Sequence, residues 1–111
     1  MSAITAHVLD TMSGRPAQDL RVQVFRADNV NNAIAYANTN INGRVSQWSA
    51  ALNAVETGTY IIKFDTGVYF ARRGIDTLYP YVDIAVNIRA GQHYHIPLLL
   101  SPFGFTTYRG S

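Results

Sequence analysis

A chain of 111 residues, 48% of them hydrophobic and only 14% charged, is expected to form one domain with a large core and little charged surface. Its net charge of +2 arises from eight arginines and one lysine that are scattered along the chain, so no basic stripe points to nucleic-acid binding. The chain lacks cysteine, a signal peptide and any apolar run of about 18 residues, which excludes disulfides and thiolate chemistry and predicts a cytoplasmic protein that does not enter a membrane.

Short runs of β-forming residues separated by turn signals fill the chain, a pattern typical of a sandwich or barrel. The expected strands are Ile4–Asp10, Arg21–Ala27, Ala33–Thr39, Arg44–Trp48, Thr59–Asp65, Tyr81–Arg89, Tyr94–Ser101 and Phe105–Tyr108. Asn42-Gly43 is the strongest hairpin signal, because both residues tolerate a positive φ.

One segment interrupts this series of strands. A short helix is expected within Gly67–Arg73, with Asp65 or Thr66 near its N-terminus and Gly74 as its C-terminal stop. The sequence therefore predicts a single all-β domain over residues 1–111. Its expected architecture is a sandwich of two antiparallel sheets, with about eight strands and one short helix on the outside.

The expected strand near the C-terminus has two unlike faces. Alternation puts four apolar side chains on one face, which reads as an ordinary core face: Tyr94, Ile96, Leu98 and Leu100. The other face combines apolar residues with two imidazoles: His93, His95, Pro97, Leu99 and Ser101. A face this apolar that also carries titratable groups predicts an oligomer that encloses a reactive pocket. The low share of charged residues favours the same conclusion.

Five residues are candidates for this pocket. His7 and His95 each place an imidazole beside a leucine, and an imidazole takes and returns a proton near neutral pH. Arg44 opens a strand, where its guanidinium would hold a planar polar ligand or an oxyanion. Ser111 brings a hydroxyl and an α-carboxylate, and Tyr108 is a candidate wall residue. Without a functional role, each histidine would be a structural residue, Arg44 a solvated turn arginine and Ser111 part of a frayed terminus.

The final segment raises two further points. Phe103, Phe105 and Tyr108 are expected to hold the last residues in a strand. His93 and His95 project to the same side, as two metal ligands would, but two ligands are too few for a tetrahedral zinc site. We therefore expect no bound metal.

Three separated segments stand out together: His-Val-Leu-Asp-Thr at residues 7–11 with Gly-Arg-Pro at 14–16, Thr-Asn-Ile-Asn-Gly-Arg at 39–44, and the run from 93 to 111. They resemble the transthyretin-related 5-hydroxyisourate hydrolases. Similarity between residues 58 and 70 extends the likeness over nearly the full chain. The terminal Tyr-Arg-Gly-Ser is the specific part, since transthyretin, a hormone carrier of the same fold, lacks that ending and the histidines.

The resemblance implies an enzyme that opens the ring of 5-hydroxyisourate during urate degradation to allantoin. It implies a homotetramer, a dimer of dimers, with sites in a channel between dimers, and neither cofactor nor metal. Carried over by position, the site residues are His7, Arg44, His95 and Ser111, with Tyr108 as a further contact. In the expected mechanism the histidines activate a water, Arg44 binds the ring and its developing charge, and Ser111 orients a histidine or the ligand. Which histidine is the base stays open at this point.

Two other functions compete with this interpretation. A carrier of small aromatic ligands would use the same channel, but a lining of histidine and arginine suits proton transfer better than hydrophobic storage. A structural or adhesive β-sandwich would give the last residues no special role. Residues appended after Ser111 would leave such a protein unaffected.

Overall fold

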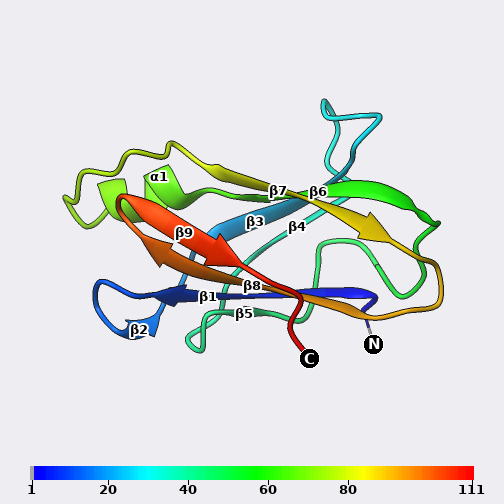
Figure 1. Cartoon of the computed structure of the whole chain (residues 1–111), viewed down its shortest axis with the longest axis horizontal. Helices are drawn as coiled ribbons and strands as arrows, with labels where there is room; N and C mark the ends of the chain where they lie inside the picture. The colour runs from blue at the N-terminus through cyan, green and yellow to red at the C-terminus, as the bar shows by residue number, and fades with distance from the viewer. Residues whose placement is uncertain (1) are drawn as a thin grey trace.

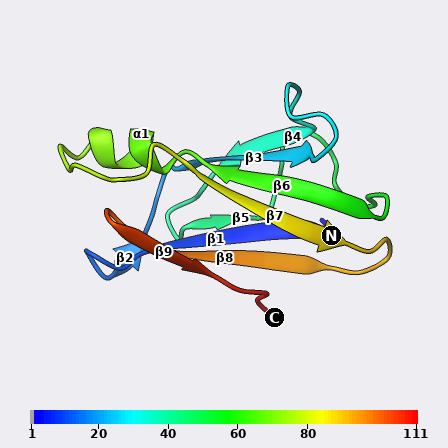
Figure 2. The same ribbon diagram turned by 45° about the horizontal axis from the view of Figure 1, so that its top comes forward.

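The computed structural model describes residues 2–111, which form two packed β-sheets and one short helix (Figures 1 and 2). The strands are β1 (Ile4–Asp10), β2 (Arg15–Pro16), β3 (Arg21–Arg26), β4 (Ala35–Asn38), β5 (Arg44–Val45), β6 (Gly58–Phe64), β7 (Val82–Ile88), β8 (Tyr94–Ser101) and β9 (Gly104–Thr107), and the helix α1 is Thr66–Ala71. The predicted sandwich with one short helix is confirmed. In this part of the chain, no helix is long and apolar enough to cross a membrane.

The first sheet has the order β2-β1-β8-β9, with β5 also paired to β1, and the second has the order β4-β3-β6-β7. In Figure 2 the second sheet lies above the first. The expectation of purely antiparallel sheets is wrong at one pairing, because β1 and β8 run parallel. Alternation of apolar and polar residues shows which face of a strand is buried. The pattern is the same whether the neighbouring strand runs parallel or antiparallel, so it cannot reveal this pairing.

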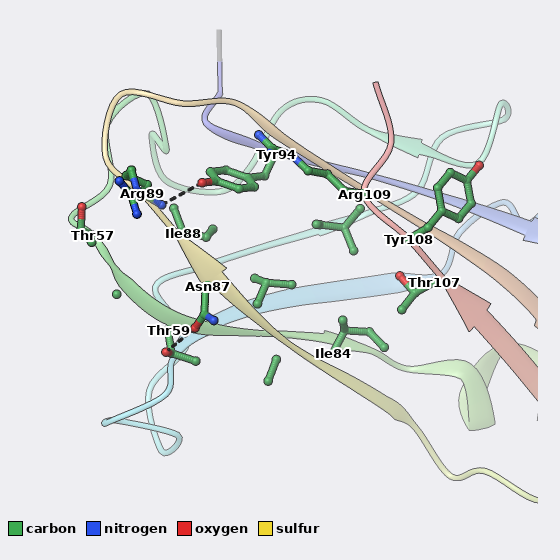
Figure 3. Close-up of a pocket in the computed structure, with 14 residues that line it drawn as sticks. Thr57, Thr59, Ile84, Asn87, Ile88, Arg89, Tyr94, Thr107, Tyr108 and Arg109 are labelled. Atoms are coloured by element: carbon green, nitrogen blue, oxygen red, sulfur yellow. Dashed lines mark hydrogen bonds between the residues drawn. The ribbon is translucent and has the colours of Figure 1, made fainter.

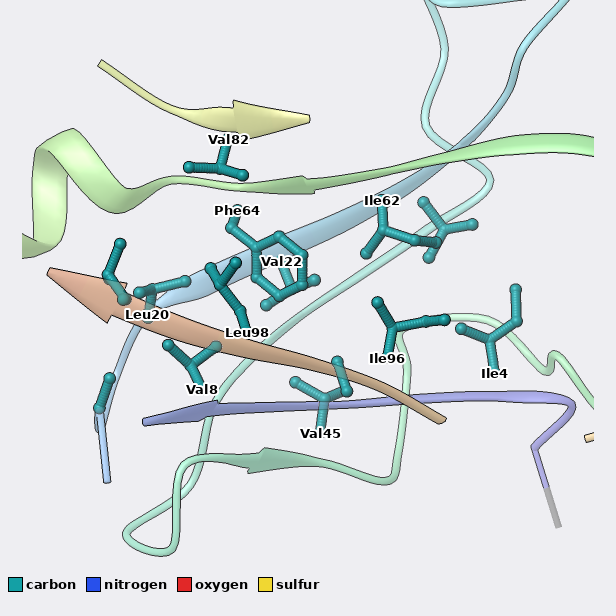
Figure 4. Close-up of a cluster of buried hydrophobic side chains, with 14 of the residues drawn as sticks. Ile4, Val8, Leu20, Val22, Val45, Ile62, Phe64, Val82, Ile96 and Leu98 are labelled. Atoms are coloured by element: carbon teal, nitrogen blue, oxygen red, sulfur yellow. The ribbon is translucent and has the colours of Figure 1, made fainter. Parts of the chain in front are cut away.

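The core lies between the inner faces of the two sheets (Figure 4). Each of the strands β1 and β8 sends alternate side chains inward, so that Val8 and Leu98 are fully buried. Ile62 and Phe64 of β6 meet them from the opposite sheet, also without solvent exposure. Because these inner residues fix the register of both strands, the residues between them are committed to the outer face.

The turn at Asn42-Gly43 forms, but the predicted hairpin is wrong. Gly43 has a φ of 73° and its N–H donates to the carbonyl oxygen of Asn40 at 2.9 Å, which closes a tight turn. The strands on either side are not partners, since β4 pairs with β3 while β5 pairs with β1. The turn thus carries the chain from one sheet to the other. A Cβ at Gly43 would lie 2.4 Å from the carbonyl oxygen of Val8, so the crossing needs glycine here.

The remaining differences concern the ends of elements and one additional short strand. The helix begins one residue earlier than expected, after Asp65 as N-cap, and Gly74 follows it with a φ of 67°. The segment Arg15–Pro16, expected as turn, pairs with β1 as β2. The expected strand Arg44–Trp48 shortens to two residues, because the chain leaves the sheet after Val45.

Candidate active site

The outer face of the first sheet collects the predicted polar residues. His7 of β1 lies opposite Arg44 of β5 on one side and opposite Pro97 of β8 on the other. One step along β1 on the same face, Thr5 lies opposite His95. The rings of His7 and His95 are stacked, with centroids 6.3 Å apart and planes inclined by 22°. Three strands that are far apart in the sequence therefore bring two imidazoles and a guanidinium onto one patch.

A pocket of about 230 Å³ opens on this patch. It is lined by Thr5, Ala6, Arg44, Val45, Ser46, His93, His95 and Ser111. Arg44, His95 and Ser111 are thus brought together as the sequence predicts, and His7 adjoins them through its stack on His95. The pocket is large enough for a small polar molecule and the groups around it are donors and titratable bases.

The last residues are held beside β8 by the main chain. The N–H of Gly110 donates to the carbonyl oxygen of His95 at 2.8 Å, and the two residues form an isolated β-bridge. The Arg109 guanidinium donates to the carbonyl oxygen of His93 at 3.0 Å and lies 4.2 Å from the centre of the Tyr94 ring. Figure 1 shows the terminus passing beside β8 towards β1 and β5.

The aromatic side chains expected to hold this terminus do not do so. Phe103 is 68% exposed and Tyr108 is 55% exposed, whereas Phe105 packs edge-on against Tyr79 with ring centres 5.2 Å apart. Phe103 lies in the turn between β8 and β9, and Tyr108 follows the end of β9, so neither belongs to a paired strand. Main-chain bonding and Arg109 take their place.

Tyr108 lines another hollow rather than the histidine pocket. A cavity of about 750 Å³ lies between β7 and the segment from β9 to Arg109 (Figure 3). In Figure 3 the Tyr108 ring points away from the lining side chains of Ile84 and Asn87. A role for Tyr108 at the site therefore stays a prediction.

Burial and a nearby positive charge keep both histidines neutral. The pKa of His7 lies below its ordinary value of 6.5, first because of burial and then because of Arg44, while a hydrogen bond with the main chain of Asn42 acts in the opposite direction. The pKa of His95 is lowered by burial, then by Arg44, His7 and His93. At neutral pH the pair therefore offers free lone pairs rather than charged rings.

Sequence reasoning did not name Thr5 as a site residue, and it considered His93 only as a metal ligand. The Thr5 hydroxyl Oγ1 lies 2.8 Å from Nδ1 of His95 and 3.3 Å from Nε2 of His93. His93 in turn has its Nδ1 2.8 Å from the carbonyl oxygen of Ser2. The available signal was the position of Thr5, two residues before His7 on the same face of β1. Within residues 2–111 no group of three or more His, Cys, Asp or Glu side chains is arranged to hold a metal.

Comparisons with known proteins agree on one family. Residues 4–110 match the model described as the HIUase/Transthyretin family. The chain is 51% identical to the probable 5-hydroxyisourate hydrolase of Schizosaccharomyces pombe, over 98% of this chain and 91% of the relative. It is 40% identical to the 5-hydroxyisourate hydrolase of Mus musculus, over 99% and 96%.

Two solved structures are similar over nearly their whole length. The 5-hydroxyisourate hydrolase of Klebsiella pneumoniae matches with a TM-score of 0.86 at 35% identity, covering all of this chain and 94% of that one. Sea bream transthyretin in complex with thyroxine also matches with a TM-score of 0.86, at 26% identity, covering 97% and 94%. The same sandwich thus occurs in proteins described as hydrolases and in one bound to a hormone.

Proposed function

The chain belongs to the HIUase/transthyretin family, and from this premise we propose that it is a 5-hydroxyisourate hydrolase of urate degradation. The observation that carries the proposal is the joint position of Arg44, His95 and Ser111 around one pocket, with His7 stacked on His95. A protein that only carries hydrophobic ligands would need none of these groups in the wall of its pocket. A hydrolase needs a base, a group that binds the developing negative charge and an acid for the leaving nitrogen.

The reaction adds water across an amide-type C–N bond of the substrate ring. One imidazole takes a proton from water as the water oxygen bonds to the ring carbonyl carbon. The negative charge that develops on the carbonyl oxygen is bound by the Arg44 guanidinium. The C–N bond then breaks, and the imidazolium returns its proton to the leaving nitrogen. Ser111 orients a histidine or the substrate from the open side of the pocket.

The lowered pKa values of both histidines favour this chemistry. A ring that is neutral at neutral pH presents a lone pair to water without first losing a proton. Arg44 serves twice, because the charge that stabilises the oxyanion also lowers the pKa of His7 and His95. The apparent pKa of catalysis belongs to the coupled pair rather than to either ring.

The proposed assembly is a homotetramer, a dimer of dimers, in a cytoplasmic setting. The strands β7 and β9 end their sheets and both line the 750 Å³ cavity, so two sheet edges lie side by side. Such edges are templates for strand pairing between copies. Leu9 and Leu99 are only partly covered on the histidine face, where a second dimer would roof the pocket. Light scattering at micromolar concentration should give four times the chain mass, and a monomer mass would contradict the assembly.

The deciding experiment follows freshly generated 5-hydroxyisourate by its absorbance and measures acceleration above spontaneous decay. The wild-type protein should accelerate the decay, and His95→Ala and His7→Ala should each slow turnover by at least about 10²-fold. Gln23→Ala, on the outer face of the other sheet, is the matched control and should retain full activity. Circular dichroism should be the same for all four proteins.

The carrier alternative makes the opposite forecast. A carrier would bind an aromatic ligand in the channel and leave the decay of 5-hydroxyisourate at its spontaneous rate. Absence of acceleration by the folded wild-type protein would therefore contradict the proposed hydrolase function. Full activity in His95→Ala would agree with a hydrolase but would contradict the proposed histidine mechanism.

A further inference from the structure

We propose that Ser2, His93 and Thr5 form a hydrogen-bond chain that holds His95 with its proton on Nδ1, so that Nε2 of His95 is the atom that takes the proton from water. Thr5 and His93 are then positioning residues, since they act through His95. The proposal rests on the proposed hydrolase function and names the base for it.

The donor–acceptor direction along the hydrogen-bond chain is set at its outer end, at Ser2. The carbonyl oxygen of Ser2 can only accept a hydrogen bond, so Nδ1 of His93, at 2.8 Å, must donate to it. In a neutral imidazole the other nitrogen then carries a lone pair. Nε2 of His93 is therefore an acceptor, and the hydroxyl of Thr5 at 3.3 Å is the donor that meets it.

The inner end follows from the single proton of a hydroxyl. Once Thr5 donates to His93, its Oγ1 has only lone pairs left for His95. Nδ1 of His95, 2.8 Å away, must then donate to Thr5, and Nε2 of His95 is left with a free lone pair. The reverse arrangement would set the lone pairs of Thr5 and His93 against each other and lose a bond, a cost of about 1 kcal/mol or more.

Gly110 leaves room for this arrangement. A Cβ at position 110 would lie 2.6 Å from Cδ2 of His95, the ring carbon next to Nε2. The C-terminal segment therefore lies close to the ring edge that carries the proposed base. Together the Thr5 bond and the Gly110 contact determine the orientation of the ring as well as its tautomer.

The direct test is nitrogen-15 NMR of the imidazoles, which is practical because the chain has only three histidines. The protein is labelled at histidine and measured at about pH 8, above the ordinary imidazole pKa of about 6.5. Signals are assigned with His7→Gln, His93→Gln and His95→Gln. The wild type should show His95 with a protonated Nδ1 and a bare Nε2, and the opposite tautomer would overturn the proposal.

Kinetics of two Thr5 variants supply the second readout. Thr5→Val has the same shape without a hydroxyl, and it should lower kcat by about 10- to 100-fold and mix the His95 tautomers. Thr5→Ser keeps the hydroxyl and should restore both the tautomer and most of kcat. His93→Phe removes the acceptor of the Thr5 hydroxyl and should also lower kcat. Equal kcat and pH profiles in Thr5→Val and wild type would overturn the relay, whereas a wild type without hydrolysis would overturn the proposed function instead.

Discussion

The main-chain N–H of Gly110 donates a hydrogen bond to the carbonyl oxygen of His95 at 2.8 Å, which fixes the end of the chain to the strand that carries the candidate base. The contact is close enough that a methyl group at position 110 would strike His95 at 2.6 Å and Pro97 at 3.0 Å. The terminus and the imidazole therefore hold their positions together.

Gly110→Ala should inactivate the enzyme without unfolding it. The added methyl group must push either the terminal segment or the His95 ring out of place, while the core between the sheets is untouched. We expect kcat/KM to fall by about 10²-fold, since misplacing a catalytic group by about 1 Å has this order of effect. Gly91→Ala is the control, because a Cβ there meets nothing within 4 Å, although its φ of 85° will cost some stability. Wild-type kinetics in Gly110→Ala would show that the terminal contact is not needed.

A second change acts on the same end of the chain. Three residues appended after Ser111 should sharply reduce turnover, because Ser111 lines the 230 Å³ pocket and an extension would fill or displace it. The melting temperature should be unchanged, as no core residue is involved. The same three residues inserted after Val30, in the exposed segment between β3 and β4 of the other sheet, serve as the control. An extended protein with full activity would assign Ser111 no role in the site.

The pH dependence should follow the lowered pKa of His7 and His95. Because both pKa values lie below the ordinary 6.5, the decline of kcat/KM in acid should have its midpoint below that pH. An acid limb with its midpoint above 6.5 would contradict this. Acid should also lower the free energy of unfolding, because the two rings bind protons at a higher pH in the unfolded state than in the folded state. The free energy of unfolding should therefore be constant above about pH 6.5 and decrease below it, as measured by urea titration.

Substitution of Arg44 should separate charge from geometry. Arg44→Ala removes the proposed oxyanion donor, which typically costs about 10²–10³ in kcat. It also removes a charge that lowers the pKa of both histidines, so the acid limb should move to higher pH. Arg44→Lys keeps the charge but loses the planar fork, and it should lower kcat with the acid limb unmoved. Arg15→Ala, an exposed arginine of β2, should change neither quantity.

The stability of the end of the sandwich remote from the histidines should depend on Tyr69. Asp10 is buried, and its carboxylate accepts bonds from the N–H groups of Met12 and Ser13 and from the Tyr69 hydroxyl at 2.9 Å. Burial and this bond raise the pKa of Tyr69 to about 12, which keeps the hydroxyl a donor. Tyr69→Phe should lower the free energy of unfolding by about 1.5–3 kcal/mol, measured by urea unfolding, with activity retained. Tyr36→Phe, on an exposed ring, should lower it by less than about 0.5 kcal/mol.

The sequence predicted the strands well where alternation was long. Tyr94–Ser101 and Ile4–Asp10 were found with the expected bounds, because one face of each is buried by the opposite sheet and the period is unambiguous. Short segments were harder. The stretch after Arg44 has strand-like residues, but only two of them find a partner on β1, and partner availability is not a local property.

Alternation also identified the two candidate histidines. Alternation placed His7 and His95 opposite the core, and the structure brings them together with Arg44 and Ser111 on one patch. The local pattern could not show that β1 and β8 lie side by side in parallel, because 83 residues lie between the end of β1 at Asp10 and the start of β8 at Tyr94. Thr5 was missed for that reason, since its importance depends on its partner across the pairing.

By itself, therefore, the sequence determined which side chains face the core and which face outward, because burial repeats with the period of a strand. The tertiary structure alone decided which strands are neighbours and in which direction they run. It also decided that Gly110 touches His95 and that Thr5 lies between His93 and His95. Those contacts join residues that are distant along the chain, and only the packing of two sheets and the free energy of their shared core selects them.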